Sequence, residues 1–121
     1  MPRFVILRHE LPGPQRGPVH WDFMLQQGET LRTWALAELP SAGLEIPTEA
    51  LADHRLAYLD YEGPVSGDRG SVSRWDCGEY ELLVDRPGKL VVQLHGGRLT
   101  GKASLQSAGN DSQRWTFEFS V

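Results

Sequence analysis

Glycine and proline interrupt this sequence so often that no long helix can develop. The chain has 13 glycines and 8 prolines in 121 residues, and its apolar residues show no sustained 3.6-residue period. Short segments that contain β-branched and aromatic residues lie between the interruptions, which indicates strands. The expected strands are Arg3–Arg8, Val19–Gln26, Thr30–Ala37, Leu56–Tyr61, Ser71–Asp76, Glu79–Val84, Lys89–His95, Arg98–Leu105 and Trp115–Ser120.

The number and spacing of these strands predict an all-β fold in a single domain over residues 1–121. A closed barrel and a two-layered sandwich both fit this pattern. Closure of short antiparallel strands into a compact β-barrel removes exposed strand edges, so the barrel is the fold that we expect. We expect one short helical turn, Thr48–Ala52, because Pro47 suits the first position of a helix.

Glycine also marks the connections between strands. Because glycine tolerates the positive φ angles of tight turns, Gln27-Gly28-Glu29 and Gly96-Gly97 predict hairpin turns. Three longer segments lack a strand pattern and predict irregular or mobile connections, namely Leu11–Pro18, Gly63–Gly70 and Ser107–Gln113.

Charge and cysteine content limit the functions that fit this chain. Its formal net charge of −4 disfavours a protein that coats long duplex DNA, but it is compatible with one that grips a single terminal phosphate. The single cysteine, Cys77, cannot form an internal disulfide. The apolar run Phe4–Leu7 is too short for a secretory or membrane segment. We therefore expect a cytoplasmic protein without a membrane partner.

A His-x-Asp pair is the first chemical signal. Side chains alternate between the faces of a strand, so His20 and Asp22 share one face. An imidazole and a carboxylate in this arrangement suit one metal ion. His9 is the best third ligand, because pairing of the first two strands would bring it close to His20. This ligand set favours manganese, iron or zinc over calcium or magnesium. An exposed hydrogen-bonded His–Asp pair explains the same spacing without a metal.

His54 and Tyr58 form a second candidate pair. They lie four residues apart, so they share a face whether the segment is a strand or a helix. An imidazole beside a phenol can hydrogen-bond a phosphate and transfer a proton. A core tyrosine next to a surface histidine fits the spacing as well, so both interpretations stay open at this point.

Further stretches surround these candidates and cover nearly the whole chain. They are Phe4-Val5-Ile6-Leu7-Arg8-His9, His20-Trp21-Asp22-Phe23, Leu31-Arg32-Thr33-Trp34-Ala35, Asp53-His54-Arg55-Leu56-Ala57-Tyr58, Tyr61-Glu62-Gly63, Trp75-Asp76-Cys77-Gly78 and Leu94-His95-Gly96-Gly97-Arg98-Leu99-Thr100-Gly101-Lys102. In this order the series resembles the 3′-phosphoesterase module of bacterial DNA ligase D, which also occurs as a stand-alone protein.

The resemblance implies a β-barrel with a polar groove and a divalent metal cofactor, manganese first and zinc second. It implies removal of a 3′-terminal ribonucleoside or 3′-phosphate from a primer strand during DNA end repair. The family's metal ligands fall on His9, His20 and Asp22, and its phosphate-engaging histidine and tyrosine fall on His54 and Tyr58. The expected partners are nucleic-acid 3′ ends and repair proteins with DNA ligase or polymerase activity.

The chain departs from the family's pattern at three positions. Met24 stands where the family has an arginine, Glu38 aligns with a lysine, and Leu7 aligns with a glutamine. The metal ligands are thus retained, whereas part of the phosphate clamp is lost and the substrate can differ. The candidates for replacing the lost positive charge are Arg8, Arg69 and Arg74.

Two other functions fit the same residues. A cupin-like non-haem iron oxygenase also uses two histidines and a carboxylate. In such enzymes the distant histidine usually follows the His-x-Asp pair, whereas His9 precedes it. A non-catalytic β-barrel that binds nucleic-acid ends without turnover fits the loss of positive charge at Met24 and Glu38.

Overall fold

The computed structural model describes residues 1–11, 19–67, 69–109 and 111–121 of the chain. Most of these residues lie in β-strands, as the sequence predicts, and one 3₁₀ turn, η1, is present among them. The elements are β1 (Arg3–Glu10), β2 (His20–Gln27), β3 (Thr30–Leu36), β4 (Glu45–Arg55), η1 (Leu56–Leu59), β5 (Gly63–Pro64), β6 (Ser71–Arg86), β7 (Lys89–Gly96), β8 (Thr100–Ala108) and β9 (Asp111–Ser120).

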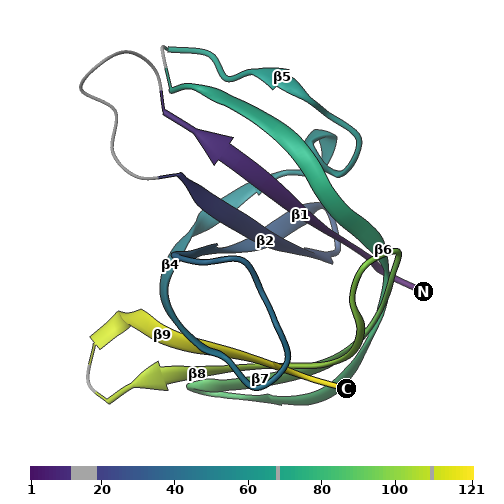
Figure 1. Cartoon of the computed structure of the whole chain (residues 1–121), viewed down its shortest axis with the longest axis vertical. Helices are drawn as coiled ribbons and strands as arrows, with labels where there is room; N and C mark the ends of the chain where they lie inside the picture. Colours follow the sequence, from purple (N-terminus) through teal and green to yellow (C-terminus); the bar gives the residue numbers. More distant parts are fainter. Residues whose placement is uncertain (12–18, 68, 110) are drawn as a thin grey trace.

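Eight of the described strands close into an antiparallel barrel (Figure 1). Neighbouring strands follow the order β1-β2-β3-β4-β9-β8-β7-β6, and pairing of β1 with β6 closes the ring. The two-residue strand β5 pairs with β6 outside the ring. The predicted antiparallel β-barrel is therefore confirmed.

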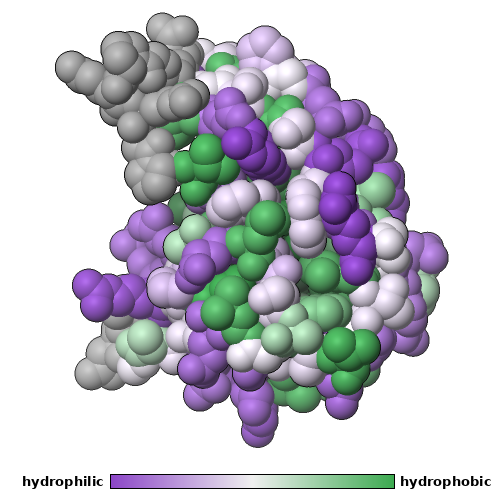
Figure 2. Space-filling view, in the orientation of Figure 1, coloured by the Kyte–Doolittle hydropathy of each residue, from purple (hydrophilic) through white to green (hydrophobic). Residues whose placement is uncertain are grey.

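Aromatic side chains fill the interior of the barrel. Phe4, Phe23, Trp34 and Phe117 are at most 1% exposed, and the rings of Phe23 and Phe117 meet edge to face with centroids 5.4 Å apart. Phe23 alternates with Asp22 and Met24 along β2, so the interior face of this strand is apolar, as the alternation predicts. On the outside, Figure 2 shows mainly hydrophilic residues around the edge of one face and hydrophobic side chains toward its middle.

A second apolar cluster lies outside the barrel wall, where η1 and the start of β6 cover β1, β2 and β3. The same outer face continues along β1 to His9 and along β2 to Asp22 and His20. The cluster therefore supports the polar residues of this face from one side. Its buried members are Val5, Leu7, Met24, Leu31, Leu59 and Val72.

The prediction of a helical turn at Thr48–Ala52 is wrong, because this segment belongs to β4. Ile46 and Thr48 are buried while Pro47 and Glu49 are exposed, which is the alternation of a strand. β4 pairs with both β3 and β9, so it is required to complete the barrel. These two sets of ladder hydrogen bonds outweigh the local preference of Pro47 for a helix start.

The prediction of a strand at Leu56–Tyr61 is also wrong. The segment forms η1, in which the Asp60 N–H donates to the Ala57 carbonyl oxygen at 3.1 Å. This turn places Leu59 on the second apolar cluster with 5% exposure. The apolar residues that indicated a strand serve this tertiary contact instead.

The expected strands Ser71–Asp76 and Glu79–Val84 are one continuous strand, β6. Gly78 maintains the ladder between them, because a Cβ at this position would overlap the His95 carbonyl oxygen on β7. The first half of β6 pairs with β1 and the second half with β7, so one long strand joins two parts of the ring.

The predicted connections between strands are confirmed in part. Gly28, with φ of 60°, turns the chain between β2 and β3, whereas Gly96 is the last residue of β7 and Gly97 begins the connection to β8. Gly63–Gly70 is largely irregular but includes β5. Most of Leu11–Pro18 and residue 110 lie outside the described residues. The prediction of an irregular segment at Ser107–Gln113 is wrong for most of its length, because β8 extends to Ala108 and β9 begins at Asp111. None of the described helices has the length and hydrophobicity needed to cross a membrane.

Candidate metal centre

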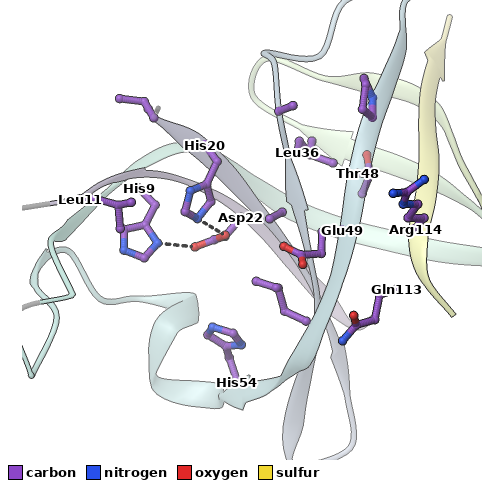
Figure 3. Close-up of a pocket in the computed structure, with 15 residues that line it drawn as sticks. His9, Leu11, His20, Asp22, Leu36, Thr48, Glu49, His54, Gln113 and Arg114 are labelled. Carbon is purple, nitrogen blue, oxygen red and sulfur yellow. Dashed lines mark hydrogen bonds and ion pairs between the residues drawn. The ribbon is translucent and has the colours of Figure 1, made fainter. Parts of the chain in front are cut away.

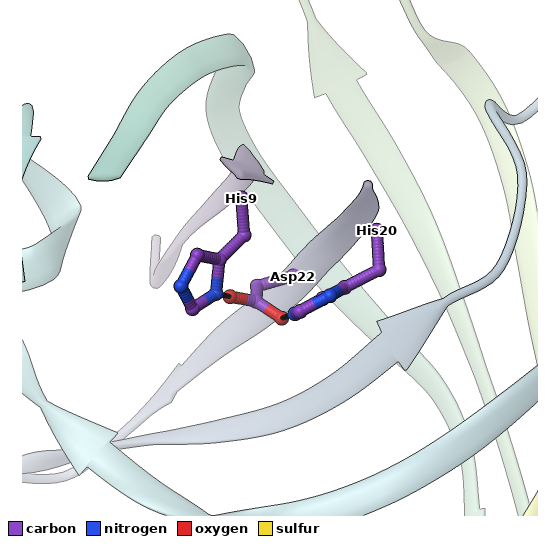
Figure 4. Close-up of side chains that lie close together, drawn as sticks. All are labelled: His9, His20 and Asp22. Carbon is purple, nitrogen blue, oxygen red and sulfur yellow. Dashed lines mark hydrogen bonds and ion pairs between the residues drawn. The ribbon is translucent and has the colours of Figure 1, made fainter. Parts of the chain in front are cut away.

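Three potential metal ligands meet at one end of the β1–β2 hairpin (Figure 4). His9 lies opposite His20 in the antiparallel register, and Asp22 lies two residues further along the same face of β2. Their ligand atoms all lie within 4.8 Å of one another. The structure therefore brings together the three residues predicted from the sequence, which we call the ligand triad.

Asp22 is the centre of the ligand triad. It is 2% exposed, and its Oδ2 lies 3.0 Å from His9 Nδ1 while its Oδ1 lies 3.1 Å from His20 Nε2. The second contact has the distance of an ion pair but not the angles of a hydrogen bond. Asp22 Oδ1 is thus a buried acceptor without a hydrogen-bond donor among the described residues. A cation beside this oxygen would compensate for its loss of water.

The second contact of His9 fixes the chemistry of its ring. His9 Nε2 donates to the Arg69 carbonyl oxygen at 2.7 Å. In a neutral ring, Nδ1 then carries the lone pair and faces Asp22 Oδ2, so that two acceptors oppose each other. A proton or a metal ion between them removes the repulsion, and metal-bound histidines commonly donate their other N–H to a backbone carbonyl. The donor set and the orientation of His9 therefore fit a divalent metal.

Contacts within the ligand triad shift the pKa values of His9 and Asp22. The hydrogen bond to Asp22 outweighs desolvation and raises the pKa of His9 above its ordinary value. Burial alone would raise the pKa of Asp22, but the close contacts and charges of His20 and His9 outweigh burial and lower that pKa. A proton on His9 therefore competes with a metal for Nδ1.

A hollow of about 360 Å³, here called the smaller hollow, lies on one side of the ligand triad. His54 from β4 and Tyr58 from η1 line it, with ring centroids 5.8 Å apart. His54 Nδ1 donates to the Ala52 carbonyl oxygen at 2.8 Å, which leaves Nε2 for another partner. The predicted pair thus lies beside the ligand triad. The other lining residues are His9, Asp22, Met24, Ala52, Asp53, Arg55, Val65, Ser66, Arg69 and Val72.

A cavity of about 920 Å³, here called the larger groove, opens on another side of the ligand triad (Figure 3). It runs over β3 and β4 toward β9, whose Gln113 and Arg114 line the end away from the triad. The remaining lining residues are His9, Leu11, Val19, His20, Asp22, Ala35, Leu36, Ala37, Pro47, Thr48, Glu49, Leu51 and His54.

The sequence model of the DNA ligase D 3′-phosphoesterase domain matches residues 13–107 of this chain. The chain belongs to this family. The matched range includes His20, Asp22, His54 and Tyr58 and begins after His9. The family resemblance predicted from the sequence is therefore confirmed.

Named relatives agree with this placement. The chain is 38% identical over 124 residues to the multifunctional non-homologous end joining protein LigD of Mycobacterium bovis, covering 93% of this chain and 15% of that protein. The corresponding LigD of Mycobacterium tuberculosis gives the same values. The LigD of Pseudomonas aeruginosa is 30% identical over 110 residues, covering 83% of this chain and 13% of that protein. This phosphoesterase-family chain thus spans about 15% of the length of its mycobacterial relatives.

The structure brings one of the three predicted arginines to the site of this phosphoesterase domain. Arg69 lines the smaller hollow, and its guanidinium donates to the carbonyl oxygen and Oγ of Ser66 at 2.7 and 3.2 Å. Arg55 lines the same hollow and was missed from the sequence. Arg55 directly follows the predicted site residue His54, and this position could have indicated its place at the hollow.

The other two predicted arginines lie elsewhere. Arg8 forms an ion pair with Glu10, and the backbone N–H of Arg74 donates to a carboxylate oxygen of Glu62 at 2.8 Å. Neither residue lines the smaller hollow or the larger groove. Their role as phosphate ligands stays a prediction without support from this geometry.

Two departures from the phosphoesterase pattern have a common structural result. Met24 is 1% exposed and Leu7 is fully buried, and both belong to the second apolar cluster. Apolar packing thus takes the place of the polar residues that the resemblance implies there. Glu38, the third departure, is exposed and lines neither cavity.

Sequence analysis also missed Glu49. It lies exposed on β4 and lines the larger groove. The alternation of buried Ile46 and Thr48 with polar neighbours was the available signal, and the erroneous helical assignment of this segment concealed it.

Proposed function

We propose that this chain is a divalent-metal-dependent 3′-phosphoesterase that processes nucleic-acid 3′ ends during DNA end joining. Its preferred ion is Mn²⁺, with Zn²⁺ as the alternative. The proposal is carried by the ligand triad, in which Asp22 Oδ1 lacks a hydrogen-bond donor among the described residues and His9 presents Nδ1 to Oδ2 of the same carboxylate. Membership of the phosphoesterase family and the end-joining role in the relatives' names support it.

The proposed substrates are primer–template ends that carry a 3′-phosphate or a 3′-terminal ribonucleoside. The proposed partners are repair proteins with DNA ligase or polymerase activity. A protein that engages one terminal phosphate needs few phosphate contacts, so the net charge of −4 is compatible with such a substrate.

His9 Nδ1, His20 Nε2 and the Asp22 carboxylate would hold the metal ion. When bound, a divalent ion polarises a phosphate oxygen and lowers the pKa of a coordinated water. The Arg69 carbonyl oxygen holds the His9 ring in the orientation that directs Nδ1 toward the centre. The second apolar cluster supports Asp22 from the side of Met24, which limits the movement of the carboxylate.

The smaller hollow would receive the phosphate. With both ring nitrogens protonated, His54 would donate from Nε2 to a phosphate oxygen or pass that proton to the leaving oxygen, and the Tyr58 hydroxyl would orient the phosphate. Arg69 and Arg55 place positive charge on the same hollow. Together these groups would take over part of the role that the resemblance gives to an arginine at position 24.

Substitution His20→Ala tests the proposal. The side chain of His20 is 25% exposed on the outer face of the barrel, so we expect the variant to fold but to lose metal uptake and phosphate release. Metal analysis of the purified protein and incubation with a primer–template bearing a 3′-phosphate or 3′-ribonucleotide measure both effects. The matched control is His95→Ala, because His95 pairs with Glu81 outside the ligand triad. Full activity in the His20 variant would contradict the assignment.

A non-catalytic end-binding barrel is the second candidate. The burial of Met24 favours it, because this apolar side chain supplies no positive charge to the hollow. It predicts that wild-type protein binds the 3′-phosphate primer without releasing phosphate at any Mn²⁺ or Zn²⁺ concentration. Family membership disfavours the iron oxygenase, and we expect no oxygen consumption with ferrous iron.

A further inference from the structure

The two cavities beside the ligand triad differ in chemistry. The smaller hollow carries His54, Tyr58 and two arginines, which suit a phosphate. The larger groove is more than twice as large and has an apolar floor that includes Ala35, Leu51 and Pro47. A phosphate held at the ligand triad and the smaller hollow would leave the larger groove for the sugar and base attached to it.

The Glu49 carboxylate stands beside this apolar floor, and Arg114 of β9 lies opposite Glu49 in the strand register. Asp22, Ala35 and Glu49 lie opposite one another on β2, β3 and β4, so all three share the outer face. Figure 3 shows the Glu49 carboxylate pointing from β4 toward the ligand triad. Neighbouring strands lie about 4.8 Å apart, which places the backbones of Asp22 and Glu49 roughly 10 Å from each other. A sugar attached to a phosphate at the triad fits this separation.

Glu49 is free to act as an acceptor. It is exposed, and it has no hydrogen-bond or ion-pair partner among the residues that the structure describes. An ionised carboxylate accepts hydrogen bonds only and repels phosphate, so a sugar hydroxyl is a better partner for it than the nucleic-acid backbone. Carboxylates recognise the 2′-hydroxyl of ribose in dinucleotide-binding proteins by the same chemistry.

We propose that the larger groove binds the 3′-terminal nucleoside and that Glu49 accepts a hydrogen bond from its ribose 2′-hydroxyl. Glu49 is then a specificity-determining residue that favours a terminal ribonucleotide over a terminal deoxyribonucleotide. This inference rests on the proposed function for the position of the phosphate.

The test compares two primer–templates that differ only in the 2′-hydroxyl of the 3′-terminal nucleotide. The dissociation constant of each is measured by fluorescence anisotropy with Mn²⁺, and kcat/KM for release of the terminal nucleoside is measured where turnover occurs. Wild-type protein is expected to favour the ribonucleotide end by about tenfold, the effect of one hydrogen bond to a charged acceptor. Glu49→Gln and Glu49→Ala are expected to bring this ratio close to one.

Glu45→Gln is the matched control. Glu45 is an exposed glutamate of the same strand that does not line the larger groove, so this variant removes the same charge and is expected to keep the wild-type ratio. Thermal unfolding of all variants verifies that each ratio is measured on folded protein.

Two results would overturn the inference. One is a wild-type protein that binds and processes both ends equally. The other is a Glu49 variant in which the affinities for both primer ends rise or fall by the same factor, because the carboxylate would then act through its charge alone. If wild-type protein releases neither nucleoside nor 3′-phosphate, the proposed function fails, but the ratio of dissociation constants still decides whether Glu49 reads the hydroxyl.

Discussion

The orientation of His9 determines what the ligand triad can bind. Its Nε2–H is committed to the Arg69 carbonyl oxygen, so Nδ1 is the nitrogen that faces Asp22 and would coordinate a metal. Nδ1 can do so only after it has lost its proton. Because the hydrogen bond to Asp22 raises the pKa of His9, the proton competes with a metal at higher pH than in an isolated histidine.

Mn²⁺ affinity is therefore expected to fall as the pH decreases through the raised pKa of His9. The decline should begin above the ordinary histidine value of about 6.5 and reach about tenfold per pH unit below it, because one proton is displaced. Calorimetric titration with Mn²⁺ between about pH 8 and pH 6 measures the effect. An affinity that stays constant over this range would exclude His9 as a ligand.

The metal-free protein should respond to pH in the opposite direction. A raised folded-state pKa means that protonated His9 stabilises the fold below its ordinary pKa, and that this contribution disappears as pH rises through the folded-state value. Because the pKa of Asp22 is lowered, ionised Asp22 stabilises the fold above the ordinary carboxyl pKa range, and this stabilisation is lost in strong acid. With EDTA present, unfolding should thus require more denaturant at about pH 5.5 than at about pH 8. His9→Gln should remove this difference.

Residues of the site were predictable from sequence where the contact is local. His9, His20 and Asp22 follow from strand alternation and from pairing within one hairpin. The Arg69 carbonyl contact to His9 was not predictable, because it joins residues 60 positions apart through a glycine-rich loop. Metal binding itself stays a prediction.

At the scale of elements, the segment from β5 to β6 is pressed against the end of β1. Gly70 has φ of 89°, and a Cβ at this position would overlap the Glu10 carbonyl oxygen. The Val65 N–H donates to the Gly70 carbonyl oxygen at 2.7 Å, which holds the segment closed. This close approach positions the Arg69 carbonyl oxygen over His9.

Gly70→Ala should therefore weaken metal binding without changing a ligand. The added Cβ displaces the segment from β1 and removes the acceptor from His9 Nε2, so we expect a loss of about tenfold in Mn²⁺ affinity. The positive φ adds a destabilisation of about 1 kcal/mol or more. Mn²⁺ titration and urea denaturation measure the two effects.

Gly28→Ala is the control for the backbone term alone. Gly28 has φ of 60°, and a Cβ there meets no atom within 4 Å, so its substitution strains a turn without displacing another element. It should lower stability while Mn²⁺ affinity stays at the wild-type value. Equal loss of affinity in both variants would show that the position of the Arg69 carbonyl oxygen is unimportant.

Elements were predicted correctly where local alternation and tertiary structure agree, as in β1, β2 and β3. They were predicted wrongly where the closed ring overrides a local signal. Pro47 indicates a helix start, but β4 must fill the gap between β3 and β9. The apolar residues of η1 resemble a strand, but they cover the outer apolar cluster.

At the scale of the whole molecule, the barrel separates its stabilising side chains from its candidate chemistry. The interior holds the aromatic core, whereas the ligand triad, the smaller hollow and the larger groove lie on the outer face. Stability and metal binding should therefore respond to different substitutions.

Phe117→Ala tests this separation. Phe117 is fully buried on β9, so its truncation should lower the free energy of unfolding by about 3–5 kcal/mol. The Mn²⁺ affinity of the protein that remains folded should match that of the wild type within about twofold. Only folded molecules bind Mn²⁺ in the titration, so a loss of stability alone does not change this affinity. Glu118→Ala, an exposed neighbour on β9, should change neither quantity. A large loss of affinity in the Phe117 variant would indicate that the core positions the ligands directly.

The way the ring closes has a consequence for the order of events during synthesis. Arg3 pairs with Glu79, and Glu45 pairs with Glu118, so both closing seams join distant parts of the chain. Barrels with such long-range pairs fold slowly compared with helical bundles. A ribosome displays the two imidazoles and the carboxylate long before it has made the carbonyl that orients the first imidazole. A metal ion would thus bind late in synthesis and folding, after the chain has been made beyond this carbonyl.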